Sequence, residues 1–192
     1  MRGVRSAGAD DAGRLAQIYA YYVEHTAISF EYDAPSEDEF RRRIESTLEK
    51  FPYLVLEEDG VILGYAYVGV FKARAAYDRS CELSVYVERT ARRRGVGRAL
   101  YEALEADLKA RGMLNLYACV ACPVSSAGDE YLTRDSERFH RRLGFETVGT
   151  FHRCAYKFGR WYDMIWMEKL IGAHEDAQER TTEKAENERE EL

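Results

Sequence analysis

The chain has 192 residues and a formal net charge of −6, with 46% hydrophobic and 32% charged residues. This length fits a single domain, and the apolar fraction is too high for a disordered protein. No apolar run approaches the roughly 20 residues of a membrane-spanning helix, and the first residues lack the apolar core of a signal peptide. The acidic charge argues against general affinity for nucleic acid. We therefore expect a cytoplasmic protein that binds neither membranes nor nucleic acid.

The hydrophobic pattern predicts alternating strands and helices along most of the chain. In chain order we expect a strand at 4–7, a helix that carries Leu15, Ile18, Tyr19 and Tyr22, a loop at 26–32, a helix at 36–50, strands at 53–57, 61–70 and 81–87, a helix at 96–110, a strand at 114–121, a helix at 136–143, and strands at 145–151 and 162–167. This order predicts an α/β domain with a mixed sheet.

Local signals mark several element boundaries. Asp10 and Asp11 stand where they can cap the first helix. Ser36 can cap the second helix, with Glu39 at its third position. The Glu58-Asp59-Gly60 segment contains the Asp-Gly pair that is typical of a two-residue hairpin turn.

The end of the chain differs in composition from the rest. Residues 172–192 contain eight acidic and three basic side chains and almost no large apolar residue. Such a segment cannot bury enough apolar surface to fold. We expect a single domain over 1–171 and a disordered tail over 172–192.

A basic, glycine-containing loop separates the strand at 81–87 from the helix at 96–110. Its sequence is Arg92-Arg93-Arg94-Gly95-Val96-Gly97-Arg98. Glycines let the backbone approach a ligand closely, and a helix N-terminus presents unpaired N–H groups that suit a phosphate. The loop lacks the Gly-Lys-Ser/Thr of a Walker motif, and Leu100 replaces the third glycine of a dinucleotide fingerprint. It therefore indicates a phosphate loop of another type, or alternatively a solvated basic turn.

Glu82 is the first candidate for a catalytic residue. Strand alternation places Cys81, Leu83 and Val85 on one face and Glu82 with its alternate neighbours Ser84 and Tyr86 on the other. A carboxylate within an apolar strand can have a raised pKa and act as a general base. The alternative is an edge-strand glutamate that faces water.

His140 and the cysteines carry weaker signals. His140 follows Phe139 on the helix at 136–143, where a lone histidine is more often a surface residue. Cys119 and Cys122 have CxxC spacing but no second Cys/His pair, so we expect no metal site. Cys81 and Cys154 are expected to be buried strand residues.

Three motifs together resemble the GNAT family of acetyl-CoA-dependent N-acetyltransferases. They are Glu82-x-Ser84-Val85-Tyr86-Val87, Arg92-x-x-Gly95-x-Gly97, and Phe139-His140-Arg141-Arg142-Leu143-Gly144-Phe145. Further segments at 21–30, 71–77 and 156–163 resemble the phosphinothricin and methionine sulfoximine acetyltransferase branch, and the likeness extends over about residues 3–170. The resemblance implies the GNAT fold, a mixed and mostly antiparallel sheet of about seven strands flanked by helices.

The resemblance also implies how acetyl-CoA, the co-substrate, binds. Backbone N–H groups of the basic loop would hold its pyrophosphate, from Arg92, Arg93, Arg94, Gly95, Val96, Gly97 and Arg98. The backbone of Val85, Tyr86 and Val87 would pair with the pantetheine arm, at a splay next to a bulge. Thr133 and Ser136 are also assigned to this site.

Catalysis by such an enzyme needs a base. A free amine with a pKa of about 8 to 10.4 is mostly protonated at pH 7 and is then not nucleophilic. The resemblance implies that Glu82 removes this proton and that the amine attacks the thioester directly. It assigns the pocket for a small amino-acid-like amine to Phe30, Tyr32, Lys72, Arg74 and Tyr77. Lys72 or Arg74 could pair with a carboxylate or phosphinate of this acceptor.

The sequence departs from the family pattern in three places. Thr133 stands where many relatives have an asparagine, and residues 124–130 are extra. The extra loop is expected to reshape the acceptor pocket or a dimer contact. His140 replaces the usual tyrosine, either as the acid that protonates the CoA thiolate or as a CoA contact.

Other readings stay open at this point. The resemblance and the aromatic last strands predict a homodimer. The acceptor could be a protein N-terminus or lysine instead of a small molecule. The domain could also bind acetyl-CoA as a sensor without catalysis.

Overall fold

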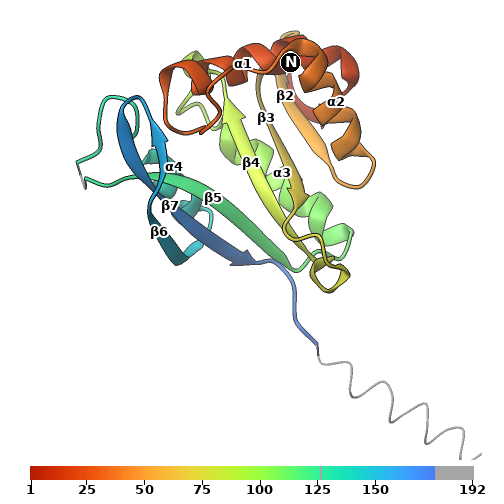
Figure 1. Ribbon diagram of the computed structural model, residues 1–192. Coiled ribbons are helices and arrows are strands. Elements are labelled where there is room, and N and C mark those ends of the chain that lie inside the picture. The colour runs from red at the N-terminus through yellow and green to blue at the C-terminus, as the bar shows by residue number, and fades with distance from the viewer. Residues whose placement is uncertain (126, 176–192) are drawn as a thin grey trace, which may run out of the picture.

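The computed structural model describes residues 1–125 and 127–175. Most of the expected acidic tail therefore lies outside the described residues. A seven-stranded sheet has the order β1-β2-β3-β4-β5-β7-β6, and only its β4–β5 pair is parallel (Figure 1). The α/β class and the mixed, mostly antiparallel sheet are thus confirmed. In the described part, no helix is both long and apolar enough to span a membrane.

The elements agree closely with the predicted ones. The strands are β1 (Arg2–Ser6), β2 (Tyr53–Glu58), β3 (Val61–Val70), β4 (Ser80–Val87), β5 (Asn115–Pro123), β6 (Glu146–Lys157) and β7 (Arg160–Leu170). The helices are α1 (Ala12–His25), α2 (Glu37–Leu48), α3 (Val96–Ala110) and α4 (Asp135–Arg142), with short 3₁₀ turns η1 (Ala9–Asp11), η2 (Ala75–Tyr77) and η3 (Arg89–Ala91).

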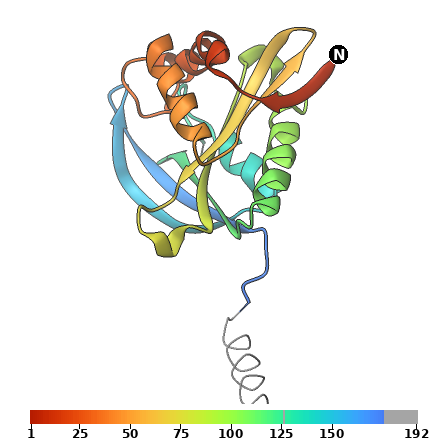
Figure 2. The same ribbon diagram turned by 90° about the vertical axis from the view of Figure 1, so that its right-hand side faces the viewer.

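Helices cover both faces of the sheet (Figure 2). The face under α3 is an apolar core to which Leu100, Leu104 and Leu108 contribute, all fully buried. The opposite face, under α1 and α2, is a second core rich in tyrosine. The predicted alternation along β4 is confirmed, because Leu83 belongs to the α3-side core whereas Tyr86 packs against the α1-side core.

The predicted turn and cap signals have different outcomes. Ser36 Oγ accepts a hydrogen bond from the Glu39 N–H at 3.2 Å, so this cap is confirmed. Asp59 and Gly60 have φ values of 49° and 82°, as the predicted hairpin turn requires. The capping of α1 by aspartate is wrong. Asp11 makes no side-chain cap bond to α1, since its carboxylate binds the Arg5 guanidinium at 2.8 Å and accepts from the Gly8 N–H.

The last two strands are longer than predicted. β6 and β7 form one hairpin whose turn is Phe158-Gly159, with φ values of 51° and 73°. Positive φ at both central positions matches a type I′ turn, but Phe-Gly is not one of its usual residue pairs. The sequence therefore did not signal the turn.

One burial prediction is wrong at the periphery. Cys154 is exposed, unlike the buried Cys81, because it lies on β6, which is the edge strand of the sheet. Leu48, the last residue of α2, is also 39% exposed.

Candidate active site

The centre of the sheet opens between β4 and β5. The two strands pair at three positions only, from Ser80↔Asn115 to Glu82↔Tyr117. Beyond them β4 continues to Val87 and β5 to Pro123, and the strands diverge (Figure 1). A narrow cleft lies in this gap, lined by side chains of both strands and by Ser136 and His140 of α4. The expected splay is therefore present.

The expected bulge beside the splay is absent from β4. The register of β4 on β3 runs without a shift from Val70↔Cys81 to Gly64↔Val87. The strands separate because β5 follows β7, with which it pairs along its whole length. The divergence of β5, and not a kink in β4, thus opens the cleft.

The edge of β4 that faces the cleft offers few backbone groups. The Glu88 N–H donates to the Leu63 carbonyl on β3 at 2.8 Å. By alternation, the backbones of Val85 and Val87 point toward β5 and that of Tyr86 points toward β3. The Tyr22 hydroxyl accepts from the Val87 N–H at 3.1 Å and donates to the Val87 carbonyl. Val85 is therefore the better placed of the three residues for pairing with a ligand.

Glu82 lies where the pairing of β4 with β5 ends. Its strand is central in the sheet, so the edge-strand alternative is wrong. Burial raises the pKa of Glu82 above its ordinary value, and the nearby Lys72 cation opposes this shift. A half-buried carboxylate of raised pKa can accept a proton near neutral pH.

The basic loop leads directly into α3. Gly95 has a φ of 75° and is the N-cap residue of the helix, and Arg93 also has a positive φ of 62°. A Cβ on Gly97 would lie 3.3 Å from the Phe139 ring, so glycine allows α3 to approach α4. The N-terminal N–H groups of α3 thus stand at the end of the cleft formed by β4 and α4.

Three of the four arginine side chains of this loop, those of Arg92, Arg94 and Arg98, are already engaged within the protein. Arg94 pairs with Glu58, and Arg98 pairs with Glu102 at 2.8 Å. The Arg92 guanidinium lies 5.2 Å from the ring centre of Tyr22. The backbone and the helix terminus, more than these side chains, are therefore left for an anion.

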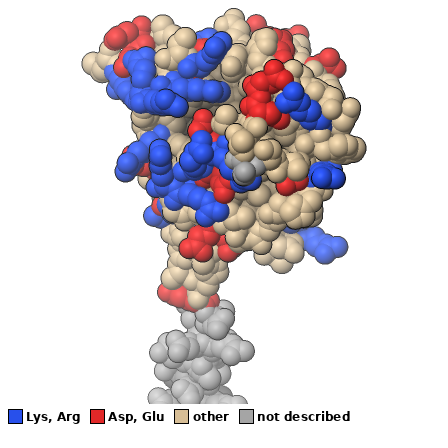
Figure 3. Space-filling model, turned by 90° about the vertical axis from the view of Figure 1, so that its left-hand side faces the viewer, with Lys and Arg blue, Asp and Glu red and all other residues tan. Residues whose placement is uncertain are grey.

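Positive charge gathers on the side of the molecule that carries α4 and the last hairpin (Figure 3). The α4 segment contributes Arg134, Arg138, Arg141 and Arg142. Arg134, Arg138 and Arg141 pair with Glu137 or Asp135, so four arginines and two acids leave this segment a net charge of about +2, which favours a polyanionic ligand nearby.

His140 is buried, so the surface-residue alternative is wrong. Its side chain packs edge-on against Phe145 at 5.3 Å. Nδ1 lies 2.8 Å from the Ser136 carbonyl oxygen, and Nε2 is buried without a partner among the described residues. Burial lowers the pKa of His140, which keeps the imidazole neutral at pH 7. A carbonyl can only accept, so Nδ1 carries the proton and the neutral imidazole leaves Nε2 as an acceptor.

The remaining acetyl-CoA candidates differ in position. Ser136 lines the cleft. Thr133 is exposed at the start of α4, where its hydroxyl accepts from the Asp135 N–H at 3.2 Å. Thr133 thus shapes the entry to α4.

The five acceptor candidates fall into two groups. Lys72, Arg74 and Tyr77 belong to the β3–β4 connection, and the Lys72 ammonium lies 5.1 Å from the Phe71 ring centre. Phe30 and Tyr32 belong to the loop between α1 and α2. Phe30 packs 6.3 Å from Tyr162, and the Tyr32 hydroxyl donates to the Tyr156 carbonyl at 2.6 Å. None of the five lines the cleft between β4 and β5.

The sequence analysis did not identify Lys157, which fixes the loop carrying Phe30. Lys157 is 2% exposed. Its ammonium donates to the carbonyls of Val23, Thr26 and Ser29 at 2.7, 3.0 and 2.7 Å. A lysine in a hairpin strand carries no signal of such burial.

The extra loop packs against the last hairpin. Asp129 accepts from the N–H groups of Tyr131 and Leu132 at 2.8 Å. Arg160 pairs with Glu130 at 2.7 Å. Over the described residues, no group of three or more His, Cys, Asp or Glu side chains is arranged to hold a metal ion.

Comparisons with known proteins agree with this geometry. A family model described as "Acetyltransferase (GNAT) domain" matches residues 4–166. Phosphinothricin N-acetyltransferase of Streptomyces viridochromogenes is 32% identical over 166 residues, which cover 86% of this chain and 86% of that protein. L-methionine sulfoximine/L-methionine sulfone acetyltransferase of Salmonella typhimurium is 30% identical, over 89% of this chain and 95% of that protein.

A solved structure extends the comparison to three dimensions. It is that of a GNAT superfamily phosphinothricin acetyltransferase from Sinorhizobium meliloti in complex with AcCoA. The TM-score is 0.80 and the sequences are 31% identical, over 89% of each chain. The range matched by the family model spans β4, the basic loop and β5 of this chain.

Proposed function

Because this chain belongs to the GNAT acetyltransferase family, we propose that it transfers acetyl from acetyl-CoA to the primary amine of a small amino-acid-like acceptor. The observation that carries this proposal is the position of Glu82. Its carboxylate, with a pKa raised by burial, stands where the pairing of β4 with β5 ends and the cleft begins. A proton acceptor and a cleft for an extended ligand therefore meet at one point.

The cleft fits acetyl-CoA in its donor groups. The N–H groups at the start of α3, between Arg92 and Arg98, would hold the pyrophosphate. The Val85 backbone would pair with an amide of the pantetheine arm, as a strand pairs at a sheet edge. The buried Nε2 of His140, which lacks a partner in the described part of the chain, would accept from a donor of the same arm. Acetyl-CoA supplies the thioester that is attacked.

Glu82 would act as the general base. It takes a proton from the substrate ammonium, directly or through a water molecule. The amine lone pair then forms the C–N bond, the C–S bond breaks, and CoA leaves as a thiolate. The Val85 N–H on the cleft edge of β4 would stabilise the charge on the carbonyl oxygen.

His140 is better suited to contact acetyl-CoA than to protonate its thiolate. An acid must carry a transferable proton, but burial lowers the pKa of His140 and its one Nδ1 proton is directed at Ser136. We therefore assign His140 to binding. The thiolate would take its proton from solvent, or from the proton that the amine releases.

The acceptor would lie across β4 from the cleft. Lys72 and Arg74 are exposed cations of the β3–β4 connection, where the Lys72 charge acts on Glu82, and they would pair with the acceptor carboxylate. Phe30 would close the pocket from the loop that Lys157 fixes. The relatives named for phosphinothricin and methionine sulfoximine support an acceptor of amino-acid size.

We further propose a homodimer. Phe151, Tyr156 and Trp161 of the last hairpin are about half exposed, at 52%, 49% and 55%. Apolar side chains on one hairpin are typical of an interaction surface. A monomeric mass measured by light scattering across a concentration series would refute the homodimer.

The test is acetyl-CoA-dependent thiol release over a panel of amines. The panel includes phosphinothricin, L-methionine sulfone, other amino acids, polyamines and short peptides, each with wild type and Glu82→Gln. We expect turnover of an amino-acid-like amine that falls at least about 100-fold in the variant, with unchanged acetyl-CoA binding. Turnover of peptides alone would favour a protein acetyltransferase. Binding of acetyl-CoA with no turnover of any amine would favour a sensor.

A further inference from the structure

A cysteine thiol lies in the cleft between β4 and β5. Cys119 of β5 lines this cleft together with Ser84 of β4. Cys119 is exposed and Ser84 is half-buried, so both side chains can touch a molecule that enters the cleft. Neither residue has a role in the acetyl transfer proposed above.

Cys119 and Ser84 stand at the same level of the two strands, on the sheet face that carries Glu82. The parallel pairing ends at Glu82↔Tyr117, and Ser84 and Cys119 each follow two residues later. Residues two apart on a strand share a face. Ala118, the neighbour of Cys119, belongs to the core under α3 on the opposite face. Two small side chains therefore flank the cleft directly beyond the proposed base.

The Cys119 thiol is electrostatically coupled to Glu82. Partial shielding of the sulfur from water raises the pKa of Cys119 to about 12, and the Glu82 charge acts in the same direction. The thiol therefore stays protonated and uncharged at pH 7. A neutral thiol behaves as a small apolar group and is a poor nucleophile. Cys119 thus offers a contact surface and does not compete with the amine for the acetyl group.

A third side chain reaches the cleft from the loop between α1 and α2. Ile28 lines the cleft and packs against the tyrosine-rich core and against the small cluster that contains Ala121. Ala121 is two residues beyond Cys119 on the same face of β5. Ile28, Ser84 and Cys119 thus bound the cleft on the Glu82 face. We call these three residues the cleft wall.

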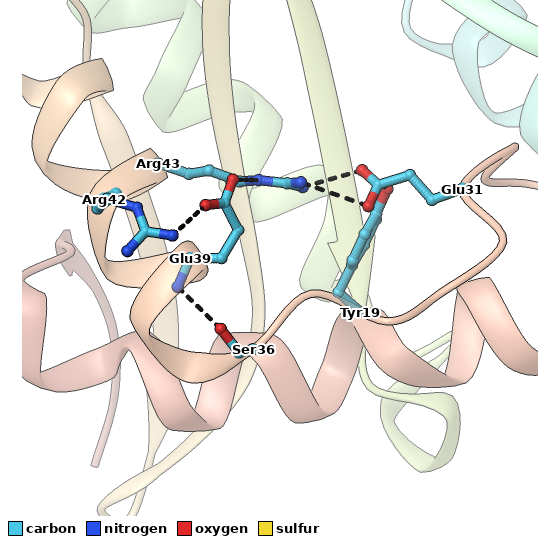
Figure 4. A network of polar contacts seen from close by, with 6 residues as sticks. All are labelled: Tyr19, Glu31, Ser36, Glu39, Arg42 and Arg43. Carbon is cyan, nitrogen blue, oxygen red and sulfur yellow. Dashed lines mark hydrogen bonds and ion pairs between the residues drawn. The ribbon is translucent and has the colours of Figure 1, made fainter.

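The loop that carries Ile28 is held by a polar network. Glu31 of this loop accepts from Arg43 of α2 at 2.9 Å and from the Tyr19 hydroxyl at 3.1 Å. Figure 4 shows Arg43 reaching across to the Glu31 carboxylate. The Tyr19 hydroxyl also lies 2.7 Å from Ser29 Oγ. A wall fixed in this way cannot yield to an oversized ligand without breaking contacts, so it can discriminate by size.

The position proposed for the thioester leaves its alkyl group facing this wall. The attacking nitrogen is placed at Glu82 and the carbonyl oxygen at the Val85 N–H, and these two residues lie on either side of Ser84 along β4. The sulfur continues into the pantetheine arm. The remaining direction from the attacked carbon leads away from β4, toward Cys119 on β5.

We propose that Cys119, together with Ser84 and Ile28, sets the length of the acyl chain that is transferred. The cleft wall accommodates the methyl group of an acetyl thioester and excludes longer aliphatic chains such as propionyl. This inference rests on the proposed function, because it places the thioester beside Glu82. Cys119 acts here as a specificity-determining residue, which contacts the methyl group and takes no part in proton transfer.

The experiment varies the size of residue 119 and the length of the acyl chain. Cys119→Ala makes this part of the wall smaller and Cys119→Val makes it larger. Cys154→Val is the control, since Cys154 is exposed on the edge strand β6 and does not line the cleft. The readout is the ratio of kcat/KM for propionyl-CoA to kcat/KM for acetyl-CoA, with one amine that wild type acetylates.

We expect Cys119→Ala to raise this ratio about tenfold and Cys119→Val to lower it about tenfold, since one methylene at a fixed wall has effects of this size. Cys154→Val should keep the ratio within about twofold of wild type. An unchanged ratio in Cys119→Ala would overturn the proposal. Changes in the same direction in Cys119→Ala and Cys119→Val would also overturn it, because they would show that the thiol itself matters and not its size.

Failure of the proposed function would look different, because wild type would then acetylate no amine. The cleft wall is in that case tested by calorimetric binding of free CoA, acetyl-CoA and propionyl-CoA. Cys119→Val should weaken propionyl-CoA about tenfold relative to free CoA, which has no acyl group, and Cys119→Ala should strengthen it. Equal changes for all three ligands, no change, or no binding of acetyl-CoA to wild type would refute the cleft wall.

Discussion

The buried ammonium of Lys157 donates to the carbonyl oxygen of Val23 at 2.7 Å, across 134 residues of sequence. The same ammonium also binds two carbonyls of the loop that follows α1. Burial lowers the pKa of Lys157, so its hydrogen bonds offset a real cost of desolvation. The loop that carries Phe30 is therefore tied to the last hairpin by this ammonium, in addition to the bond from the Tyr32 hydroxyl to the Tyr156 carbonyl.

Replacing Lys157 should loosen this loop. We expect Lys157→Met to lower the free energy of unfolding by about 2 to 4 kcal/mol, because three carbonyls lose their donor. Denaturant unfolding measures this change. Lys50→Met is the control, since Lys50 is an exposed lysine in an ion pair with Asp78 and should change stability by less than about 0.5 kcal/mol. Equal losses of unfolding free energy in the two variants would show that the Lys157 hydrogen bonds do not stabilise this loop.

The pH dependence of activity should report Glu82. The pKa of its carboxyl is raised by burial, so kcat/KM should fall as pH drops through that raised pKa, where the base becomes protonated. The measurement is kcat/KM between pH 5 and 9, with the amine concentration corrected for its own ionisation. An acid limb that persists unchanged in the residual activity of Glu82→Gln would assign this limb to another group.

The ionised Glu82 carboxylate, which activity requires, should lower the stability of the folded state. A carboxyl whose folded pKa is raised destabilises the folded state above that pKa, and the penalty is lost as pH falls below the unfolded value of about 4.3. Glu82→Gln should therefore have a higher Tm than wild type at pH 7 to 8, and the difference should shrink toward pH 4. A variant that is less stable at pH 8 would show that the carboxylate makes favourable contacts instead.

His140 gives a separate pH prediction. If His140 acts as a neutral acceptor, kcat should stay level from pH 7 to 9, because losing an imidazolium proton plays no part. His140→Phe should raise the KM for acetyl-CoA about fivefold through loss of one hydrogen bond, and His140→Gln should retain part of the affinity. If kcat instead falls as the pH rises from 6 to 8, and this fall is absent from both variants, His140 is the acid that protonates the thiolate.

Gly97 tests the close approach of α3 to α4. A Cβ there would crowd the Phe139 ring at 3.3 Å, next to the cleft. We expect Gly97→Val to raise the KM for acetyl-CoA about tenfold and to leave the KM for the acceptor within about twofold. Gly3→Val is the control, since a Cβ at Gly3 meets nothing within 4 Å. A larger rise in the KM for the acceptor than in the KM for acetyl-CoA would indicate that the cleft beside Gly97 binds the acceptor instead.

Much of the fold follows from local sequence patterns. The 3.6-residue spacing of Leu100, Leu104 and Leu108 predicted α3 with its observed bounds, and the alternation in β4 predicted which face carries Glu82. The Asp-Gly pair gave the β2–β3 turn. These features succeed because each depends on backbone preferences and on neighbours only a few residues apart.

The candidate site was predicted in part. The basic loop and Glu82 carry motifs with a short spacing; the structure places Glu82 at the last β4–β5 pair and the loop at the N-terminus of α3. The burial of His140 has no local signal, because it results from the packing of α4 against Phe145 and β5. The cleft itself depends on β5 following β7 instead of β4.

By itself, the sequence determined the α/β class, most helices and strands, the basic loop at a helix N-terminus and the face of Glu82. Only the tertiary structure decided the burial of Lys157 and His140, the lost aspartate cap at α1 and the Phe158-Gly159 turn. Each of these arises where residues distant in sequence meet. Burial, a missing hydrogen-bond partner and the pKa shifts that follow are properties of that packing, which no local pattern contains.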